Sequence, residues 1–175
     1  MGGLAVVIEL TIADTAEMEA SGARLAPLLR AGDLVLLNGE LGAGKTTLTR
    51  GLGVALGARG AVTSPTFVLA REHPTASGVP LVHVDAYRLA SWRELDDLAL
   101  DYAHSIVVVE WGAGKLDGVS ESWLSIEIRR PTGATANAGA LADPEELERD
   151  EPRQVTISGK GPRGVELEAL LAAAE

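Results

Sequence analysis

The stretch that decides the fold runs from Leu34 to Arg50 and reads LVLLNGELGAGKTTLTR. The apolar run Leu34–Leu37 is followed by three glycines within six residues, and these by a lysine and two threonines. A hairpin turn would need only the Asn-Gly pair before the chain returned to a strand. Here leucines recur instead at positions 48, 52 and 56, which is helical spacing. The sequence therefore predicts a strand, a glycine-rich loop and a helix.

Residues 39–46 match the phosphate-loop pattern G-x-x-x-x-G-K-[ST] in full. Glycines let the backbone close around an anion without a Cβ in the way, and successive N–H groups then point inward at a helix N-terminus. The lysine of this pattern reaches the β- and γ-phosphates, and the hydroxyl behind it binds Mg²⁺. A glycine turn with a chance lysine is the competing interpretation. We predict that the nucleotide is bound by Gly39, Glu40, Leu41, Gly42, Ala43, Gly44, Lys45, Thr46 and Thr47.

Composition limits the class of protein. The chain has 175 residues, 46% of them hydrophobic, which suits a single globular domain spanning residues 1–175. Without a cysteine there is neither a disulfide framework nor a thiolate metal site, and the net charge of −10 argues against a broad nucleic-acid surface. No apolar run approaches the roughly 18 residues of a membrane span, and the N-terminus does not resemble a signal peptide. We expect a cytoplasmic protein that does not contact membranes.

Helical and strand patterns alternate along the chain. Strands are expected at 6–10, 34–37, 66–70, 81–85, 106–109, 124–128 and 154–158. Helices are expected from Asp14 to about position 29, from the glycine loop to about 56, from Ser91 to about 98, and over 165–174. Residues 131–153 are interpreted as a solvated insertion with a short helix from Asp143. The predicted fold class is α/β: a three-layer P-loop NTPase fold with a mostly parallel sheet and antiparallel C-terminal edge strands.

Two acidic residues end apolar strands and are the candidates for metal and water chemistry. Asp85 closes the run 81–84, and Glu110 closes the run 106–109. Functional carboxylates gather at the carboxyl ends of parallel strands, and an apolar strand that ends in one acid is the Walker B pattern. Aspartate is usual at that position, so Glu110 is a departure. The motifs N-K-x-D and D-x-x-G are absent, which favours adenine over guanine as the base.

Four motifs in order carry a resemblance to a known family. The phosphate loop is followed by Val62-Thr63-Ser64-Pro65-Thr66-Phe67, by His83-Val84-Asp85-Ala86-Tyr87-Arg88-Leu89 and by Val109-Glu110-Trp111. This set closely resembles the TsaE (YjeE) family, small ATPases of bacterial tRNA threonylcarbamoyladenosine synthesis. The resemblance covers about residues 14–128 well, and it weakens over the insertion and the C-terminal helix.

The resemblance implies roles for matching positions. Lys45 and the loop amides would bind the phosphates of ATP or ADP, and Thr46 and Glu110 would hold Mg²⁺. Asp85 would lie near the γ-phosphate, on Mg²⁺-bound or attacking water. Thr66 would face the nucleotide from a switch-like loop, and Thr15 would approach the adenine. Lys45, Asp85 and Glu110 are thus the expected catalytic residues, and Thr46, Asp85 and Glu110 the expected metal ligands.

The resemblance also implies partners. Family members work with TsaD and TsaB in the modification of adenosine 37 of tRNA, where TsaD handles the tRNA, so contact with tRNA would be indirect. We expect slow ATP hydrolysis by the protein alone and activation by its partners, since no arginine has an obvious position beside the γ-phosphate. Arg88 and Arg129 could nevertheless supply that charge. Two other functions stay open: a small-molecule kinase whose lid would be residues 131–153, with Arg149 and Arg153, and a nucleotide-binding regulator without turnover.

Overall fold

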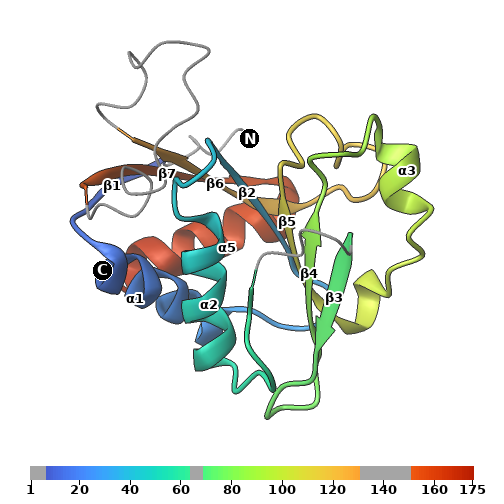
Figure 1. The fold of residues 1–175 in the computed structure, drawn as a ribbon, viewed down its shortest axis with the longest axis horizontal. Coiled ribbons are helices and arrows are strands. Elements are labelled where there is room, and N and C mark those ends of the chain that lie inside the picture. Colours follow the sequence, from blue (N-terminus) through green and yellow to red (C-terminus); the bar gives the residue numbers. More distant parts are fainter. Residues whose placement is uncertain (1–6, 64–68, 131–150) are drawn as a thin grey trace.

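The computed structural model describes residues 7–63, 69–130 and 151–175. Their centre is one seven-stranded sheet in the order β1-β7-β6-β2-β5-β4-β3 (Figure 1). The strands are β1 (Ile8–Ile12), β2 (Leu34–Gly39), β3 (Ala70–His73), β4 (Leu81–Asp85), β5 (Ile106–Glu110), β6 (Trp123–Arg129) and β7 (Arg153–Lys160). The helices are α1 (Thr15–Leu25), α2 (Lys45–Ala55), α3 (Trp92–Asp96) and α5 (Gly161–Ala173), with 3₁₀ turns at Ala26–Leu28 and Tyr102–His104.

The middle of the sheet is parallel and its outer pairs are antiparallel. β6, β2, β5 and β4 run parallel to one another, whereas β7 pairs antiparallel with both β6 and β1, and β3 pairs antiparallel with β4. This confirms the predicted fold class. The strands at 124–128 and 154–158 were both expected at an antiparallel edge. Instead β7 lies one place inside, because the N-terminal strand β1 closes the sheet beyond it, and β6 lies two places inside, where it pairs parallel with β2 and antiparallel with β7.

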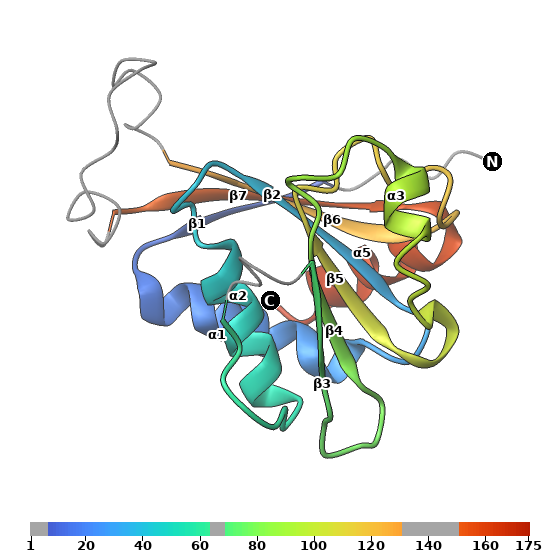
Figure 2. The same ribbon diagram turned by 45° about the vertical axis from the view of Figure 1, so that its right-hand side comes forward.

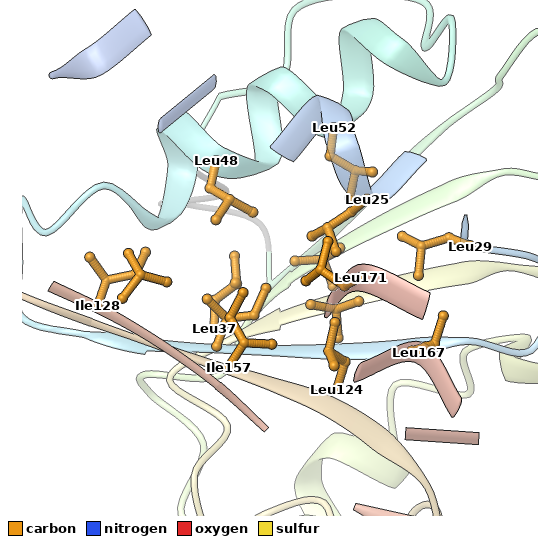
Figure 3. Packing of buried hydrophobic residues seen from close by; sticks show 14 of the residues in the cluster. Leu25, Leu29, Leu37, Leu48, Leu52, Leu124, Ile128, Ile157, Leu167 and Leu171 are labelled. Atoms are coloured by element: carbon orange, nitrogen blue, oxygen red, sulfur yellow. The ribbon is translucent and has the colours of Figure 1, made fainter. Parts of the chain in front are cut away.

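Alternation along the central strands divides the core between the two faces of the sheet. Val35 and Leu37 of β2 point to the face covered by α1, α2 and α5, and Leu34 and Leu36 point to the opposite face. Figure 3 shows leucines from all three helices meeting the strand side chains of the first face. The opposite face is covered by the segment that contains α3, which lies across the sheet from α1 and α2 (Figure 2). The result is a three-layer arrangement.

The position of α2, the helix that follows the glycine loop, is fixed by its contact with α1. A Cβ on Gly51 of α2 would overlap the carbonyl oxygen of Glu19, and a Cβ on Gly22 of α1 would overlap that of Leu48. The two helix backbones therefore touch at glycines. Side chains therefore cannot be added at Gly51 or Gly22 without moving α2.

Asp14 fixes the start of α1, because its carboxylate accepts a hydrogen bond from the Glu17 N–H at 2.8 Å.

Most predicted elements are present with shifted ends. The first strand covers positions 8–12 instead of 6–10, and β3 begins where an extended segment was expected to end. The first helix stops at Leu25 and continues as a 3₁₀ turn, and the last helix starts at Gly161, with a proline in its first turn. Expectations for positions 66–68 and for the short helix from position 143 lie outside the described residues. No helix within the described ranges is long and apolar enough to cross a membrane.

Candidate nucleotide site

The glycine loop joins the carboxyl end of β2 to the first turn of α2. Gly42 and Gly44 have φ angles of 78° and 116°, a region that side chains other than glycine rarely adopt. Lys45 is the first residue of α2, so the N–H groups of the helix start face the loop. Ala43 turns its methyl group into the core and is 1% exposed. This combination of loop and helix N-terminus is the architecture that binds phosphate in many proteins.

Lys45 lies under the loop and is almost fully buried. Its Nζ donates hydrogen bonds to the carbonyl oxygens of Gly39 at 2.7 Å and Glu40 at 2.9 Å, and it lies 4.0 Å from the centre of the Trp111 ring. Burial lowers the pKa of this lysine, while the nearby Glu110, Asp85 and Glu40 carboxylates act in the opposite direction. The ammonium is therefore a desolvated cation, which strengthens its attraction for an anion.

Glu110 ends the buried strand β5, and its side chain contacts both α2 and β4. Its Oε1 accepts hydrogen bonds from the Thr46 hydroxyl at 3.1 Å and from His83 Nε2 at 2.8 Å. The side chains of His83 and Glu110 are 0% and 4% exposed. Because a buried charge requires a partner, this arrangement allows a carboxylate to face the loop from the end of a hydrophobic strand.

Asp85 lies directly beside Glu110. Strands β4 and β5 are parallel and in register, so that these two residues are partners across the ladder. Asp85 Oδ1 accepts a hydrogen bond from the Tyr87 N–H at 2.9 Å, which orients the carboxylate at the strand end. The sequence-based expectation that both acids gather at this edge of the sheet is therefore met.

The oxygens at this edge fit Mg²⁺. The Thr46 hydroxyl and the carboxylates of Glu110 and Asp85 are hard ligands, and Mg²⁺ commonly takes one or two carboxylates and completes its shell with water and phosphate oxygens. Among the described residues there is no cluster of three or more acidic, histidine or cysteine side chains that could hold a metal by itself. The donor set therefore suits a metal that arrives with a nucleotide.

An open pocket of about 610 Å³ lies in front of these groups. It is lined by Leu41, Gly42, Gly44, Lys45, Thr46, Thr47, Asp85, Tyr87, Arg88, Glu110 and Trp111. The volume is within the range of small-molecule sites. Tyr87 and Trp111 form an edge-to-face pair with ring centres 5.1 Å apart, which places an aromatic wall beside the lysine.

A second pocket of about 560 Å³ adjoins the first across Leu41 and Trp111. Gly39 and Glu40 line this second pocket, together with Arg129 and Arg130 at the end of β6. Arg129 is exposed and pairs with Glu127 at 2.7 Å. The two pockets thus lie on either side of the loop tip.

The structure brings most predicted site residues together. Lys45, Thr46, Thr47, Asp85 and Glu110 share the larger pocket with Leu41, Gly42 and Gly44, whereas Gly39 and Glu40 line the neighbouring pocket. Ala43 contributes only its backbone, since its side chain is in the core. Thr15 is the first residue of α1 and does not line this pocket. Thr66 lies outside the described residues.

Three further residues were not predicted as site residues. His83 holds Glu110, and Trp111 lies over the lysine with a positive φ of 61°. Arg153, at the start of β7, donates to carbonyl oxygens of the glycine loop. Trp111 and His83 stand within motifs already singled out, next to or two residues before an acid, and could have been inferred from that position. Arg153 has no local sequence signal, because it meets the loop only through the sheet topology.

The order of the sheet and the strand, loop and helix at its centre define the P-loop NTPase fold. A solved structure of YdiB from Bacillus subtilis superposes with a TM-score of 0.71 and 25% identity, covering 99% of both chains. The family model described as "Threonylcarbamoyl adenosine biosynthesis protein TsaE" matches residues 12–137, so this chain belongs to the TsaE family.

Curated relatives agree with the family model. The chain is 56% identical to the tRNA threonylcarbamoyladenosine biosynthesis protein TsaE of Streptomyces coelicolor over 150 residues, which is 83% of this chain and 93% of the relative. It is 47% identical to the protein of the same name from Mycobacterium leprae, over 63% of this chain and 75% of the relative. The Bacillus subtilis protein of that name is 38% identical, over 65% and 72%. The sequence-based recognition of the family is confirmed.

Proposed function

We propose that this protein binds and hydrolyses Mg-ATP to support the threonylcarbamoyladenosine modification of tRNA. The observation that carries the proposal is the hydrogen bond from the Thr46 hydroxyl to Glu110 Oε1, at 3.1 Å. It joins the first turn of the phosphate-loop helix to the end of a central strand, and both oxygens belong to a set that suits Mg²⁺. Lys45, whose side chain is buried, immediately precedes Thr46 in the chain.

Each residue has a defined task in this proposal. Lys45 releases the two backbone carbonyls and binds the β- and γ-phosphates, together with the N–H groups of the loop and helix start. Thr46 and Glu110 hold Mg²⁺, which when bound neutralises the negative charge on the phosphates. Asp85 accepts a hydrogen bond from the attacking water and orients it toward the γ-phosphate.

The biological setting is proposed from the names of the relatives. Those proteins are called tRNA threonylcarbamoyladenosine biosynthesis proteins. We propose that this chain serves the same modification, at adenosine 37, as the ATPase partner of a TsaD–TsaB complex. The tRNA would be held by TsaD, which agrees with the net charge of −10 of the present chain.

The test is ATP turnover by the purified protein, alone and with TsaD and TsaB, with ADP and phosphate measured as products. We expect Mg²⁺-dependent hydrolysis that increases when the partners are present. Binding without turnover in either condition would favour a nucleotide-dependent regulator. Transfer of phosphate to a metabolite in a screen of small-molecule acceptors would favour a kinase.

A further inference from the structure

Arg153 supports the phosphate loop from behind. Its Nε donates a hydrogen bond to the Ala43 carbonyl oxygen at 3.2 Å, and one of its terminal nitrogens lies 3.5 Å from the Gly42 carbonyl oxygen. The other terminal nitrogen donates to the Glu151 carbonyl oxygen at 2.6 Å. The residue is 8% exposed, so these contacts form in a largely dry environment.

The contact with Ala43 fixes the direction of a neighbouring N–H group. In a trans peptide the C=O of one residue and the N–H of the next point in opposite directions. Since the Ala43 carbonyl faces Arg153, the Gly44 N–H points away from Arg153, and Gly44 itself lines the nucleotide pocket. The Ala43 N–H is already bonded to the Glu40 carbonyl oxygen at 3.0 Å, so the N–H group that the Arg153 contact orients is that of Gly44.

The Ala43–Gly44 peptide needs such a support. Gly44 has a φ of 116°, and a glycine backbone has several conformations of similar energy. A flip of this peptide would turn the Gly44 N–H out of the pocket and a carbonyl oxygen into it, which repels a phosphate. A hydrogen bond from a charged donor disfavours that flip.

We propose that Arg153 is a positioning residue for nucleotide phosphate, which keeps the Gly44 amide turned into the pocket before the ligand arrives. This inference rests on the proposed nucleotide-binding function. The residue lies beyond the span 12–137 that the family model matches. Because the apparent affinity falls in proportion to the fraction of protein in the binding-competent conformation, loss of the support weakens binding of every ligand with a phosphate in the loop.

The experiment compares Arg153→Met, Arg153→Lys and the wild-type protein by calorimetry with ADP and with inorganic pyrophosphate. The Met variant retains an apolar stem but no donor, and we expect it to bind both ligands about tenfold more weakly. The Lys variant can still donate a hydrogen bond to one carbonyl oxygen, so it should recover part of the lost affinity for both ligands.

The matched control is Arg163→Met. Arg163 also forms a partly buried set of hydrogen bonds, to Asp33 and to the Leu28 carbonyl oxygen, but it does not touch the loop. This variant should lose stability and keep its affinity for ADP. Equal affinities of wild type and Arg153→Met within twofold, or an equal loss in Arg163→Met, would overturn the inference.

Two further measurements separate the possible failures. If Arg153→Met does not fold, Arg153→Gln is measured in its place, because the glutamine side chain is too short to donate a hydrogen bond to the Ala43 carbonyl oxygen. About tenfold weaker binding of ADP by this variant supports the inference, and unchanged binding overturns it. Lys45→Ala is measured in parallel. If wild type binds ADP and Lys45→Ala does not, while Arg153→Met is unaffected, only this inference fails. If wild type does not bind ADP, the proposed function fails and this inference fails with it.

Discussion

His83 Nε2 lies 2.8 Å from Glu110 Oε1, and both side chains are buried. An ionised carboxylate can only accept hydrogen bonds, so Nε2 carries the proton that joins the two residues. His83 Nδ1 has no hydrogen-bond partner within the described part of the chain. Among these described residues the imidazole therefore has one polar contact, and that contact fixes the carboxylate that also accepts a hydrogen bond from Thr46.

His83→Leu is expected to raise the Mg²⁺ concentration needed for half-maximal ADP binding by about tenfold or more, because residues that orient a metal ligand typically contribute that much. His83→Gln can still donate to Glu110 and should stay within about threefold of wild type. The measurement is a Mg²⁺ titration of ADP binding, with thermal unfolding as the control for folding. Identical Mg²⁺ dependence in the two variants would contradict a role for this hydrogen bond.

Lys45→Ala should abolish ATP binding and preserve the fold. The lysine makes charge-assisted contacts with phosphates in proteins of this fold, each worth about 1.5–3 kcal/mol, so a loss of at least about a hundredfold in affinity is expected. Calorimetry in the presence of Mg²⁺ measures the affinity, and circular dichroism checks the fold. Undiminished affinity for ATP would rule out the phosphate-loop assignment.

The buried Lys45 ammonium also predicts a pH effect on stability. Burial lowers the pKa of this lysine below its ordinary 10.5, so the unfolded chain holds the proton more tightly than the folded chain does. Between the folded and unfolded pKa values the unfolded state binds more protons, and the free energy of unfolding rises with pH. The free energy of unfolding of wild type should therefore increase relative to that of Lys45→Met as the pH rises toward 10.5. Denaturant unfolding at several pH values tests this, and a shift of opposite sign would contradict it.

The two neighbouring acids should differ in their effects. Glu110→Gln should weaken Mg²⁺ dependence and turnover, since an amide oxygen is a poorer ligand for a hard cation. Asp85→Asn should retain ADP binding and lower hydrolysis by about two orders of magnitude, the usual contribution of a group that accepts a proton from the nucleophile. Asp101→Asn, an exposed carboxylate paired with His104, is the control. Turnover at the wild-type rate in both site variants, with partners present, would place neither acid in the reaction.

How far the sequence predicts this molecule can be judged at the strands that end in the site. The runs at 81–85 and 106–110 are short, β-branched and closed by an acid, and their hydrophobic pattern was sufficient to place both carboxylates at one sheet edge. The glycine loop could also be predicted from the sequence, because its glycines, lysine and threonine together are typical of a phosphate-binding loop at a helix N-terminus.

Long-range pairing is what the sequence did not reveal. The strand at 154–158 alternates as an edge strand does, and nothing local indicates that β1 pairs beyond it. For the same reason Arg153 could not be connected with Ala43, which precedes it by 110 positions in the chain. The hydrogen bond between His83 and Glu110 also depends on the register between β4 and β5. The expected roles of Thr15 and Thr66 in nucleotide binding stay predictions.

Gly51→Ala tests the close contact of the phosphate-loop helix α2 with α1. In an exposed helix this change stabilises by about 1 kcal/mol, because alanine has the higher helix propensity. Here the new Cβ would overlap the backbone of Glu19 in α1, and we expect a loss of about 1–3 kcal/mol in the free energy of unfolding instead. The control is Val54→Ala, whose side chain is 75% exposed on the same helix. Equal or greater stability of Gly51→Ala in denaturant unfolding would show that α1 and α2 separate at no cost.

The charge that develops on the γ-phosphate during hydrolysis leads to the last prediction. A phosphate loop and Mg²⁺ leave part of this charge uncompensated, and in GTPases an added arginine is worth about a thousandfold or more in rate. Arg88 lines the larger pocket beside Asp85, whereas Arg129 lines the neighbouring pocket and pairs with Glu127. Within the described ranges Arg88 is thus the one arginine that lines the larger pocket, where the sequence had indicated no obvious one.

Single-turnover hydrolysis should therefore be slow for the isolated protein and at least about tenfold faster with saturating TsaD and TsaB. Arg88→Ala should lower the activated rate by about tenfold or more with little change in ADP affinity, because the cation acts on charge that appears only in the transition state. Arg129→Ala should leave the rate unchanged and is the matched control. Equal rates with and without the partners would contradict partner activation, and a full rate in Arg88→Ala would mean that the compensating charge comes from a partner protein.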